Sequence, residues 1–301
     1  MITPPETLTP NPWEWQQLRK KFHQSTTLAS LVLAAWQMGM WMAREFVIHE
    51  LQRRAQQREN WGNCPVCGTR LHSKGYGHRR MLTLVGWVDW ERRVGRCPKH
   101  CKGSQQAPLD EQLGIAPYAQ TSVELVRLGC LLALFLPYGL AVEILQQFCG
   151  VRLSDTVLWQ WVQQYGQQAQ ESVKQQLQDW QQGSKPDLEP LSAELAALPL
   201  LIGADGVSVP FRPQAKSPRG KIVYQEIKVG LLVRLGSRLK RSGERVSQLL
   251  HRRIVAVRGD IEALQGQLQL EAHRQSIESA PQVAWISDGA RGLWGLFERC
   301  F

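Results

Sequence analysis

The chain has 301 residues, of which 43% are hydrophobic, and its formal net charge is +10. This length predicts two or three domains, and the hydrophobic content excludes an intrinsically disordered protein. No apolar run reaches the ~18 residues that a membrane span needs, and the N-terminus lacks the features of a signal peptide. We therefore expect a cytoplasmic protein with reduced thiols, in which Cys130, Cys149 and Cys300 are ordinary free cysteines.

The positive charge is concentrated in two stretches of the chain. Residues 64–104 hold nine Lys/Arg against two acids, a net charge of +7. Residues 205–259 hold thirteen Lys/Arg against three acids, a net charge of +10, whereas residues 160–204 are net acidic. Separated basic stretches are typical of a protein that holds a polyanion along two surfaces. The alternative is ordinary solvated charge.

Residues 1–60 are predicted to form a helical N-terminal region. After a proline-rich start, Ser25 or Thr26 is placed to cap a long helix that ends near Arg58. Apolar residues recur along it at steps of three to five, as they do on one helix face. They are Leu28, Leu31, Ala35, Met38, Met42, Phe46 and Leu51. This stripe could form core or a dimer surface, and core is the favoured interpretation.

Residues 61–107 contain four cysteines with the spacing of a zinc ribbon. They form two close pairs, Cys64-x2-Cys67 and Cys97-x3-Cys101. Thiolates are soft ligands, and four of them suit the tetrahedral shell of a structural zinc ion. His100 competes with Cys101 for the fourth position, and the spacing favours Cys101. The alternatives are two disulfides or four unrelated buried thiols.

The stretch between the two cysteine pairs is predicted to be a β-hairpin. Met81–Val85 is rich in strand-forming residues, Gly86 interrupts the pattern, and Trp87–Val94 continues it with alternation. We expect arginines on the rim of the hairpin and Trp87 and Trp90 on its faces, as in a clamp on the DNA backbone. The arginines are Arg79, Arg80, Arg92, Arg93 and Arg96. Alternatively, the tryptophans pack the ribbon.

Residues 108–180 are predicted to form a helical, helix-turn-helix-like region that binds DNA. The expected helices are Ser122–Phe135, Tyr138–Phe148 and a third from Ser154 to about Trp180. Gly150 marks the turn before the third helix, and Ser154 is a good N-cap. A helix, a Gly-containing turn and a capped helix in succession are typical of a helix-turn-helix motif, although the same pattern also recurs in helical bundles. The first turn would present Asp155, Thr156 and Gln160.

Residues 181–197 are predicted to be a linker, and residues 198–301 change to strands. An apolar run at residues 198–204 ends in Asp205-Gly206, and the buried strand Val283–Ser287 ends in Asp288-Gly289. Between them we expect a strand pair or one long strand at Lys221–Leu235, a further strand at Arg253–Arg258, and a helix from Ile261 to about Ser276 that Asp260 caps.

The two aspartates are the candidate catalytic residues. Each follows a strand and precedes a glycine that lets the chain turn away, so each carboxylate is expected at the same edge of the sheet. If the strands are neighbours, Asp205 and Asp288 converge, and their repulsion is relieved by a cation such as Mg²⁺. Two such ions about 4 Å apart assist phosphodiester transfer. A single Asp-Gly after a strand is more often a plain turn.

These motifs, in this order, resemble the ISKra-type insertion-sequence transposases. The resemblance covers most of the chain from about Gly62 onward. It rests on the cysteine quartet, Leu82–Val88, Arg93–Cys101, Pro108-Leu109-Asp110, Leu113-Gly114, Ala204–Val207, Glu226–Gly230, Ser287–Ala290 and Trp294.

The resemblance implies a multidomain α+β protein that ends in an RNase H-like α/β core of the DDE type. Asp205 and Asp288 would be its first and second catalytic carboxylates and would hold Mg²⁺ or Mn²⁺. Lys228 falls in the next strand, where a DNA contact is expected. The expected partner is double-stranded DNA, both transposon ends and target. A homo-oligomer associated with the nucleoid is also expected.

The chain departs from that family pattern after Asp288. The third carboxylate of such a core sits on a helix beyond the second aspartate's strand, and Glu298, the only acid that follows, is too close to it. We therefore expect an incomplete, C-terminally truncated core with exposed apolar surface. One alternative is a non-catalytic DNA-binding remnant or repressor of transposition. Another is an RNase H-like nuclease such as a junction resolvase.

Overall fold

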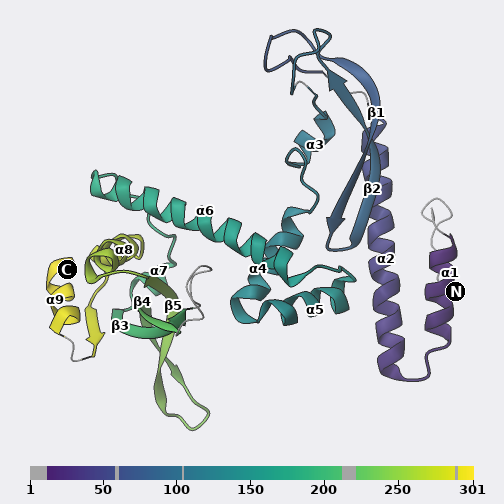
Figure 1. The fold of residues 1–301 in the computed structure, drawn as a ribbon. Coiled ribbons are helices and arrows are strands. Elements are labelled where there is room, and N and C mark those ends of the chain that lie inside the picture. The colour runs from purple at the N-terminus through teal and green to yellow at the C-terminus, as the bar shows by residue number, and fades with distance from the viewer. Residues whose placement is uncertain (1–11, 58–60, 104, 212–221, 289–290) are drawn as a thin grey trace. The chain divides into compact units, whose positions relative to one another are not determined.

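The structure, a computed structural model, describes residues 12–57, 61–103, 105–211, 222–288 and 291–301. Within these ranges nine α-helices and two β-sheets form a mixed protein of the α+β type (Figure 1). At this coarse level the predicted fold class is confirmed. The chain divides into two compact units, residues 1–167 and residues 168–301.

The first unit begins with two helices, α1 (Pro12–His23) and α2 (Leu28–Ala55). Thr27 caps α2, because its hydroxyl accepts a hydrogen bond from the Ser30 backbone N–H at 3.2 Å. The Ser30 hydroxyl in turn accepts one from the Thr27 N–H at 3.2 Å. This reciprocal pair satisfies N–H groups that no helical carbonyl reaches. The prediction that Ser25 or Thr26 caps the helix is therefore wrong, and the helix ends slightly before the predicted end.

The apolar stripe predicted for α2 is not its buried face. Ala34 and Trp41 are buried, whereas Leu28 is 77% exposed and Phe46 is 51% exposed. Trp41 packs on Trp15 of α1, with ring centroids 5.1 Å apart. Because α2 is apolar on several sides, periodicity could not show which side its neighbours cover. The core interpretation is wrong for the exposed members of the stripe, and the dimer-surface alternative stays a prediction.

The predicted hairpin is confirmed as two antiparallel strands, β1 (His72–Thr83) and β2 (Gly86–Arg96). Gly86 has a φ of 98°, which a residue with a side chain adopts only with strain. The hairpin runs along α2 (Figure 1). Their shared core consists of Ala55, Met81, Val88, Trp90 and Leu109. Trp90 therefore packs inside, whereas Trp87 is 45% exposed.

Four helices follow the hairpin: α3 (Pro108–Gln112), α4 (Val123–Phe135), α5 (Tyr138–Cys149) and α6 (Asp155–Gln181). Gly150 turns the chain after α5 with a φ of 66°. The Ser154 hydroxyl accepts a hydrogen bond from the Val157 N–H at 3.2 Å and so caps α6. The three helices predicted here are confirmed; their role in reading DNA stays a prediction.

The second unit contains one four-stranded sheet. Its strands are β3 (Leu200–Phe211), β4 (Val223–Leu239), β5 (Arg245–Val257) and β6 (Val283–Ser287), in the order β5-β4-β3-β6. β3, β4 and β5 form an antiparallel meander, and β6 returns parallel to β3. Between β5 and β6 lies α8 (Ile261–Arg274), which Asp260 caps as predicted, followed by a 3₁₀ turn at Ile277–Ser279. The last helix is α9 (Arg291–Cys300).

Helices α8 and α9 cover one face of this sheet, and among the described residues of the second unit the opposite face is open. The covered core includes Ile202, Leu232, Leu264, Leu268 and Leu296, all fully buried. On the open face Ile254 is 71% exposed and Ile286 is 59% exposed. The prediction that Val283–Ser287 is a buried strand is therefore wrong, because β6 pairs only with β3 and lies at the sheet edge.

The segment before β3 is fastened to the second unit. It contains the short helix α7 (Ala193–Ala196). The Glu189 backbone N–H donates to the Arg274 carbonyl at 2.9 Å. The Glu189 carboxylate forms ion pairs with Arg253 and, at 3.2 Å, with His251 when that ring is protonated. This part of the predicted linker is thus held in place by charge as well as by the backbone.

Candidate metal centre, basic surface and carboxylate pair

The first cysteine pair lies in a tight turn built from backbone hydrogen bonds. The Cys64 N–H donates to the Thr69 carbonyl at 2.8 Å, and the Gly68 N–H donates to the Cys64 carbonyl at 2.9 Å. Gly68 has a φ of 69°, which lets the chain reverse so closely. The turn brings the sulfurs of Cys64 and Cys67 within 4.8 Å of each other.

The second pair completes a cluster of four sulfurs. The Sγ atoms of Cys64, Cys67, Cys97 and Cys101 all lie within 4.8 Å of one another. Cys67 Sγ is 3.5 Å and Cys101 Sγ is 3.8 Å from Cys97 Sγ. A tetrahedral ion with metal–sulfur bonds of about 2.3 Å requires sulfurs about 3.8 Å apart. The cluster therefore fits one metal ion, and the structure assigns Cys101 rather than His100 to the fourth corner.

The protonation of these thiols is interdependent. Hydrogen bonding by Thr69 lowers the pKa of Cys67 to about 6, whereas the adjacent Cys67 sulfur raises the pKa of Cys101 to about 12. Four such thiols cannot all ionise side by side without a cation to offset their charge. None of the seven cysteines, all within the described residues, forms a disulfide. Within the quartet the structure therefore shows four thiols at metal-binding spacing and no disulfide.

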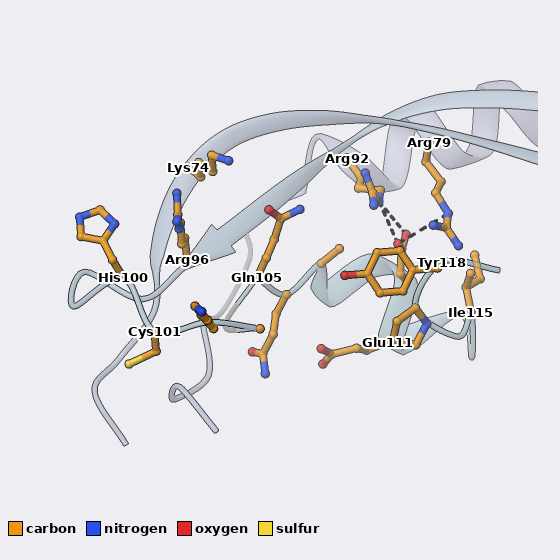
Figure 2. A pocket seen from close by; sticks show the side chains of 16 residues that line it. Lys74, Arg79, Arg92, Arg96, His100, Cys101, Gln105, Glu111, Ile115 and Tyr118 are labelled. Carbon is orange, nitrogen blue, oxygen red and sulfur yellow. Dashed lines mark hydrogen bonds and ion pairs between the residues drawn. The ribbon is translucent and has the colours of Figure 1, made fainter. Parts of the chain in front are cut away.

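A basic pocket of about 810 Å³ lies beside the second cysteine pair (Figure 2). Its lining includes the cationic residues Lys74, Arg79, Arg92, Arg96 and Lys102, together with His100. In Figure 2 the exposed residues Lys74, Arg96 and His100 lie near Cys101. Arg79 and Arg92 instead pair with Asp110. Lys74 and Lys102 belong to the basic stretch, but sequence reasoning did not single them out as contact residues. Lys74 lies in a strand and Lys102 in a loop, and only the folded structure shows that both line the same pocket.

The prediction that all five arginines lie on the rim of the hairpin is wrong for Arg92 and for Arg79, whose side chain is only 13% exposed. Arg92 is buried, and its Nε donates to both Asp110 oxygens at 2.9 and 3.0 Å. Its Nη1 donates to the Gly77 carbonyl at 2.8 Å. Arg79 donates to the Ala119 carbonyl. The charge of Arg92 is therefore used inside the protein, where it ties α3 to the hairpin.

The remaining three arginines of the hairpin, Arg80, Arg93 and Arg96, lie on accessible surface. Arg80 stacks over the Trp87 ring at 4.6 Å and pairs with Asp89 at 3.5 Å. Arg93 lies over the Tyr76 ring at 5.4 Å. Stacking keeps a guanidinium extended while its outer edge still faces solvent. Arg80 and Arg96 are exposed and Arg93 is half-buried, so these three suit contact with an anionic partner.

The two candidate catalytic aspartates come together through the pairing of β3 with β6. Ala204 pairs with Ser287 in parallel register, so Asp205 and Asp288 are the next residues on neighbouring strands. Adjacent strands lie about 4.8 Å apart. Ala204 is buried under α8 and α9, so the alternation of the strand places Asp205 on the open face. Both aspartates are exposed and line a pocket of about 270 Å³.

The local path of β3 differs from the prediction. The strand does not end at Asp205-Gly206 but continues to Phe211, and Asp205 pairs with Val229 of β4. The Asp205 carboxylate instead lies beside the point where the neighbouring strand β6 ends. The Asp205 Oδ1 accepts a hydrogen bond from the Gly206 N–H at 2.7 Å. Gly289, expected to turn the chain after Asp288, lies outside the described residues.

The remaining predicted site residues do not lie at the carboxylate pocket. Lys228 is largely buried on the helix-covered side of β4, and its ammonium pairs with Glu226 at 2.6 Å. Glu298 is exposed on α9 and does not line the carboxylate pocket. In the described part of the chain, Asp205 and Asp288 are the only acids that line it. Asp155, Thr156 and Gln160 are exposed at the start of α6, as predicted.

A scan of the chain against models of known protein families finds no match, and a search of the curated proteins finds none either. Among the described residues no helix is long and apolar enough to cross a membrane.

Proposed function

We propose that this protein is a DNA transposase of the insertion-sequence type. It binds transposon-end DNA through basic surfaces on both units. It uses Asp205 and Asp288 for metal-dependent cleavage and strand transfer. A structural zinc ion held by the four cysteines keeps the hairpin of the first unit in shape.

The topology of the second unit supports an RNase H-like core. Three antiparallel strands are followed by α8 and then by β6, which pairs in parallel with the first strand of the meander. This arrangement brings the first and last strands of the unit together. A carboxylate from each is then presented on the same open face.

Zinc is the metal that best suits the cysteine cluster. Four thiolates at tetrahedral spacing select a soft or borderline ion, and closed four-sulfur sites are structural rather than catalytic. The cluster joins the turn at Cys64–Cys67 to the end of β2 at Cys97. The site therefore stabilises the far end of the hairpin.

The carboxylate pair suits Mg²⁺ or Mn²⁺, hard ions that prefer oxygen ligands. When bound, such ions activate an attacking water or 3′-hydroxyl and stabilise the leaving oxygen of a phosphodiester. Asp205 is held in position by the sheet and by its hydrogen bond to Gly206. Both carboxylates face solvent, so a DNA backbone could reach them.

The parallel register of β3 and β6 is the observation that carries the proposal. Its test is Mn²⁺-dependent nicking and joining of supercoiled plasmid DNA by the zinc-loaded full chain. Asp205→Asn and Asp288→Asn should each lower the rate by about a hundredfold to a thousandfold, the scale of lost electrostatic catalysis. Asp187→Asn, an exposed residue outside the pocket, is the control and should leave it unchanged.

The same assay separates the alternatives. Nicked DNA without joined products would favour an RNase H-like nuclease or resolvase. Activity unchanged in both Asp→Asn variants would remove the carboxylate assignment.

A non-catalytic DNA-binding protein, such as a repressor of transposition, is the second candidate. One observation favours it: in the described residues only two acids line the pocket, and Glu298 is not among them. In this candidate function both basic surfaces bind DNA, and the carboxylates catalyse no reaction. DNA binding by a chain that nicks nothing with any divalent ion would support it.

A further inference from the structure

The β4–β5 hairpin extends beyond the sheet as a two-stranded arm. Leu200, the first residue of β3, pairs with Arg234, and the Leu235 N–H donates to the Pro199 carbonyl at 2.9 Å. Within the described residues, β3 itself does not pair with Leu235–Leu239 of β4. These residues still pair with Arg245–Leu249 of β5. At about 3.3 Å per residue, the paired part of the arm is roughly 17 Å long. Figure 1 shows this ribbon projecting from the sheet of the second unit.

The tip of the arm is exposed and basic. Its five-residue connection, Lys240–Glu244, closes with a hydrogen bond from the Lys240 N–H to the Glu244 carbonyl at 2.9 Å. Its cationic residues are Arg238, Lys240, Arg241 and Arg245, all exposed. The one acid, Glu244, pairs with Lys240 at 2.9 Å. The net charge of the tip is therefore carried by the three arginines.

The stem of the arm is narrow, which suits entry into a groove. Ser237 pairs with Ser247, and Gly236 pairs with Gln248. A Cβ added at Gly236 would lie 2.7 Å from Leu250 Cδ1 and would have to displace the end of that side chain. The major groove of B-DNA, about 12 Å wide, accommodates a two-stranded β-ribbon of this kind.

We propose that this arm inserts into the major groove of duplex DNA, with Arg238, Arg241 and Arg245 contacting phosphates on the groove walls. The inference rests on the proposed DNA-binding function and assigns one of its surfaces. Arg238 and Arg245 lie on opposite faces of the ribbon, because Arg245 pairs with Leu239 and not with Arg238. The ribbon can therefore reach the walls on both sides.

The position of the arm sets its distance from the carboxylate pair. Asp205 pairs with Val229, and Arg238 lies nine residues further along β4. At about 3.3 Å per residue the separation along the strand is roughly 30 Å. At 3.4 Å per base pair this is about nine base pairs, close to one turn of DNA. One duplex can thus reach both the arm and the carboxylates.

The test compares two double variants of equal charge change in the zinc-loaded full chain. Arg238→Ala with Arg241→Ala removes two arm cations. Lys174→Ala with Lys185→Ala removes two exposed cations from the acidic stretch and is the matched control. The probe is a labelled 30-base-pair duplex of mixed sequence, and fluorescence anisotropy is measured from 0.05 to 0.2 M salt.

The arm variant should lower the slope of log affinity against log salt by about 1.8, because two phosphate contacts are lost. Its affinity at 0.1 M salt should fall by roughly tenfold or more. The control should match the wild type, and Arg238→Lys with Arg241→Lys should keep most of the binding, because the charges remain. Methyl green, which occupies the major groove, should compete with the wild type, whereas netropsin in the minor groove should not.

The outcomes separate this proposal from the one on which it rests. Wild-type protein that binds no duplex at any salt concentration would overturn DNA binding altogether. Steeply salt-dependent wild-type binding with equal slopes for the two Ala variants would overturn only the arm. The arm proposal would also be overturned by an arm variant that binds DNA normally but no longer self-associates. An arm variant that binds DNA normally but no longer binds anionic vesicles would overturn it as well.

Discussion

The cysteine cluster and the carboxylate pair are assembled over different distances in the chain. Each half of the cluster is a local turn, and one metal ion can hold the two halves together. The carboxylates come from the first and last strands of the second unit and meet only through the pairing of β6 with β3. The metal of the cluster should therefore determine stability. A metal at the carboxylates should affect activity and leave the fold unchanged.

Loss of the cysteine-bound metal should have the largest effect on the fold. Cys64→Ser should remove the bound zinc and unfold the far end of the hairpin, since structural zinc contributes on the order of 10 kcal/mol to small metal-bound folds. Metal analysis and thermal denaturation measure both effects. Cys130→Ser, outside the cluster, should keep one zinc per chain and the wild-type melting temperature. Full zinc content in Cys64→Ser would remove the assignment.

The buried Arg92–Asp110 pair should be the next most sensitive point of the first unit. Asp110→Asn leaves the Arg92 charge buried without its partner, which typically costs about 3–5 kcal/mol of folding stability. Asp89→Asn, at the solvent-exposed pair with Arg80, should cost at most about 1 kcal/mol. Urea denaturation of both variants compares them. Equal effects would mean that the buried pair does not link α3 to the hairpin.

In the second unit, a helix cap should matter moderately. Asp260→Ala removes the side chain that accepts a hydrogen bond from the Ala263 N–H at 2.9 Å, at a cost of about 1 kcal/mol. Denaturation of the zinc-loaded protein measures this loss of folding stability. Asp187→Ala, at an exposed position before α7, should change little. A loss of metal from the cysteine cluster in Asp260→Ala would show that the two regions are not independent.

The smallest effect is expected at Glu45, and it depends on pH. Burial raises the pKa of Glu45 above its ordinary value of 4.5, although the neighbouring Arg44 opposes the shift. As pH rises above 4.5 the unfolded chain ionises first, so this group lowers the stability of the folded state. Glu45→Gln should therefore stabilise the protein slightly at pH 7 and leave its stability unchanged well below pH 4.5. A gain that persists at pH 3.5 would contradict this explanation.

The features that the sequence predicted well are those set by neighbouring residues. The spacing of Cys64 and Cys67 indicates a metal-binding turn, and Asp260 marks a helix start, because both depend on contacts within a few residues. The convergence of Asp205 and Asp288 also followed from the pattern of strand and Asp-Gly. It required only that the two strands be neighbours, which the structure bears out.

The features that the sequence did not predict depend on distant partners. The buried side of α2 is determined by its packing against α1 and the hairpin. The apolar pattern of α2 alone does not indicate that Trp41 is buried and Phe46 exposed. The pairing of Arg92 with Asp110 likewise has no local signature, so Arg92 was assigned to the surface. The position of Asp205 inside β3 depends on the length of β4, which supports β3 beyond the end of β6.

The central claim is that Asp205 and Asp288 form one divalent-metal site, and Mn²⁺ titration of the zinc-loaded full chain, followed by electron paramagnetic resonance, tests it most directly. The wild type should bind Mn²⁺. Asp205→Asn and Asp288→Asn should each lose that binding to a similar extent while keeping their zinc and their melting temperature. Wild-type Mn²⁺ binding that survives in either variant would contradict the claim.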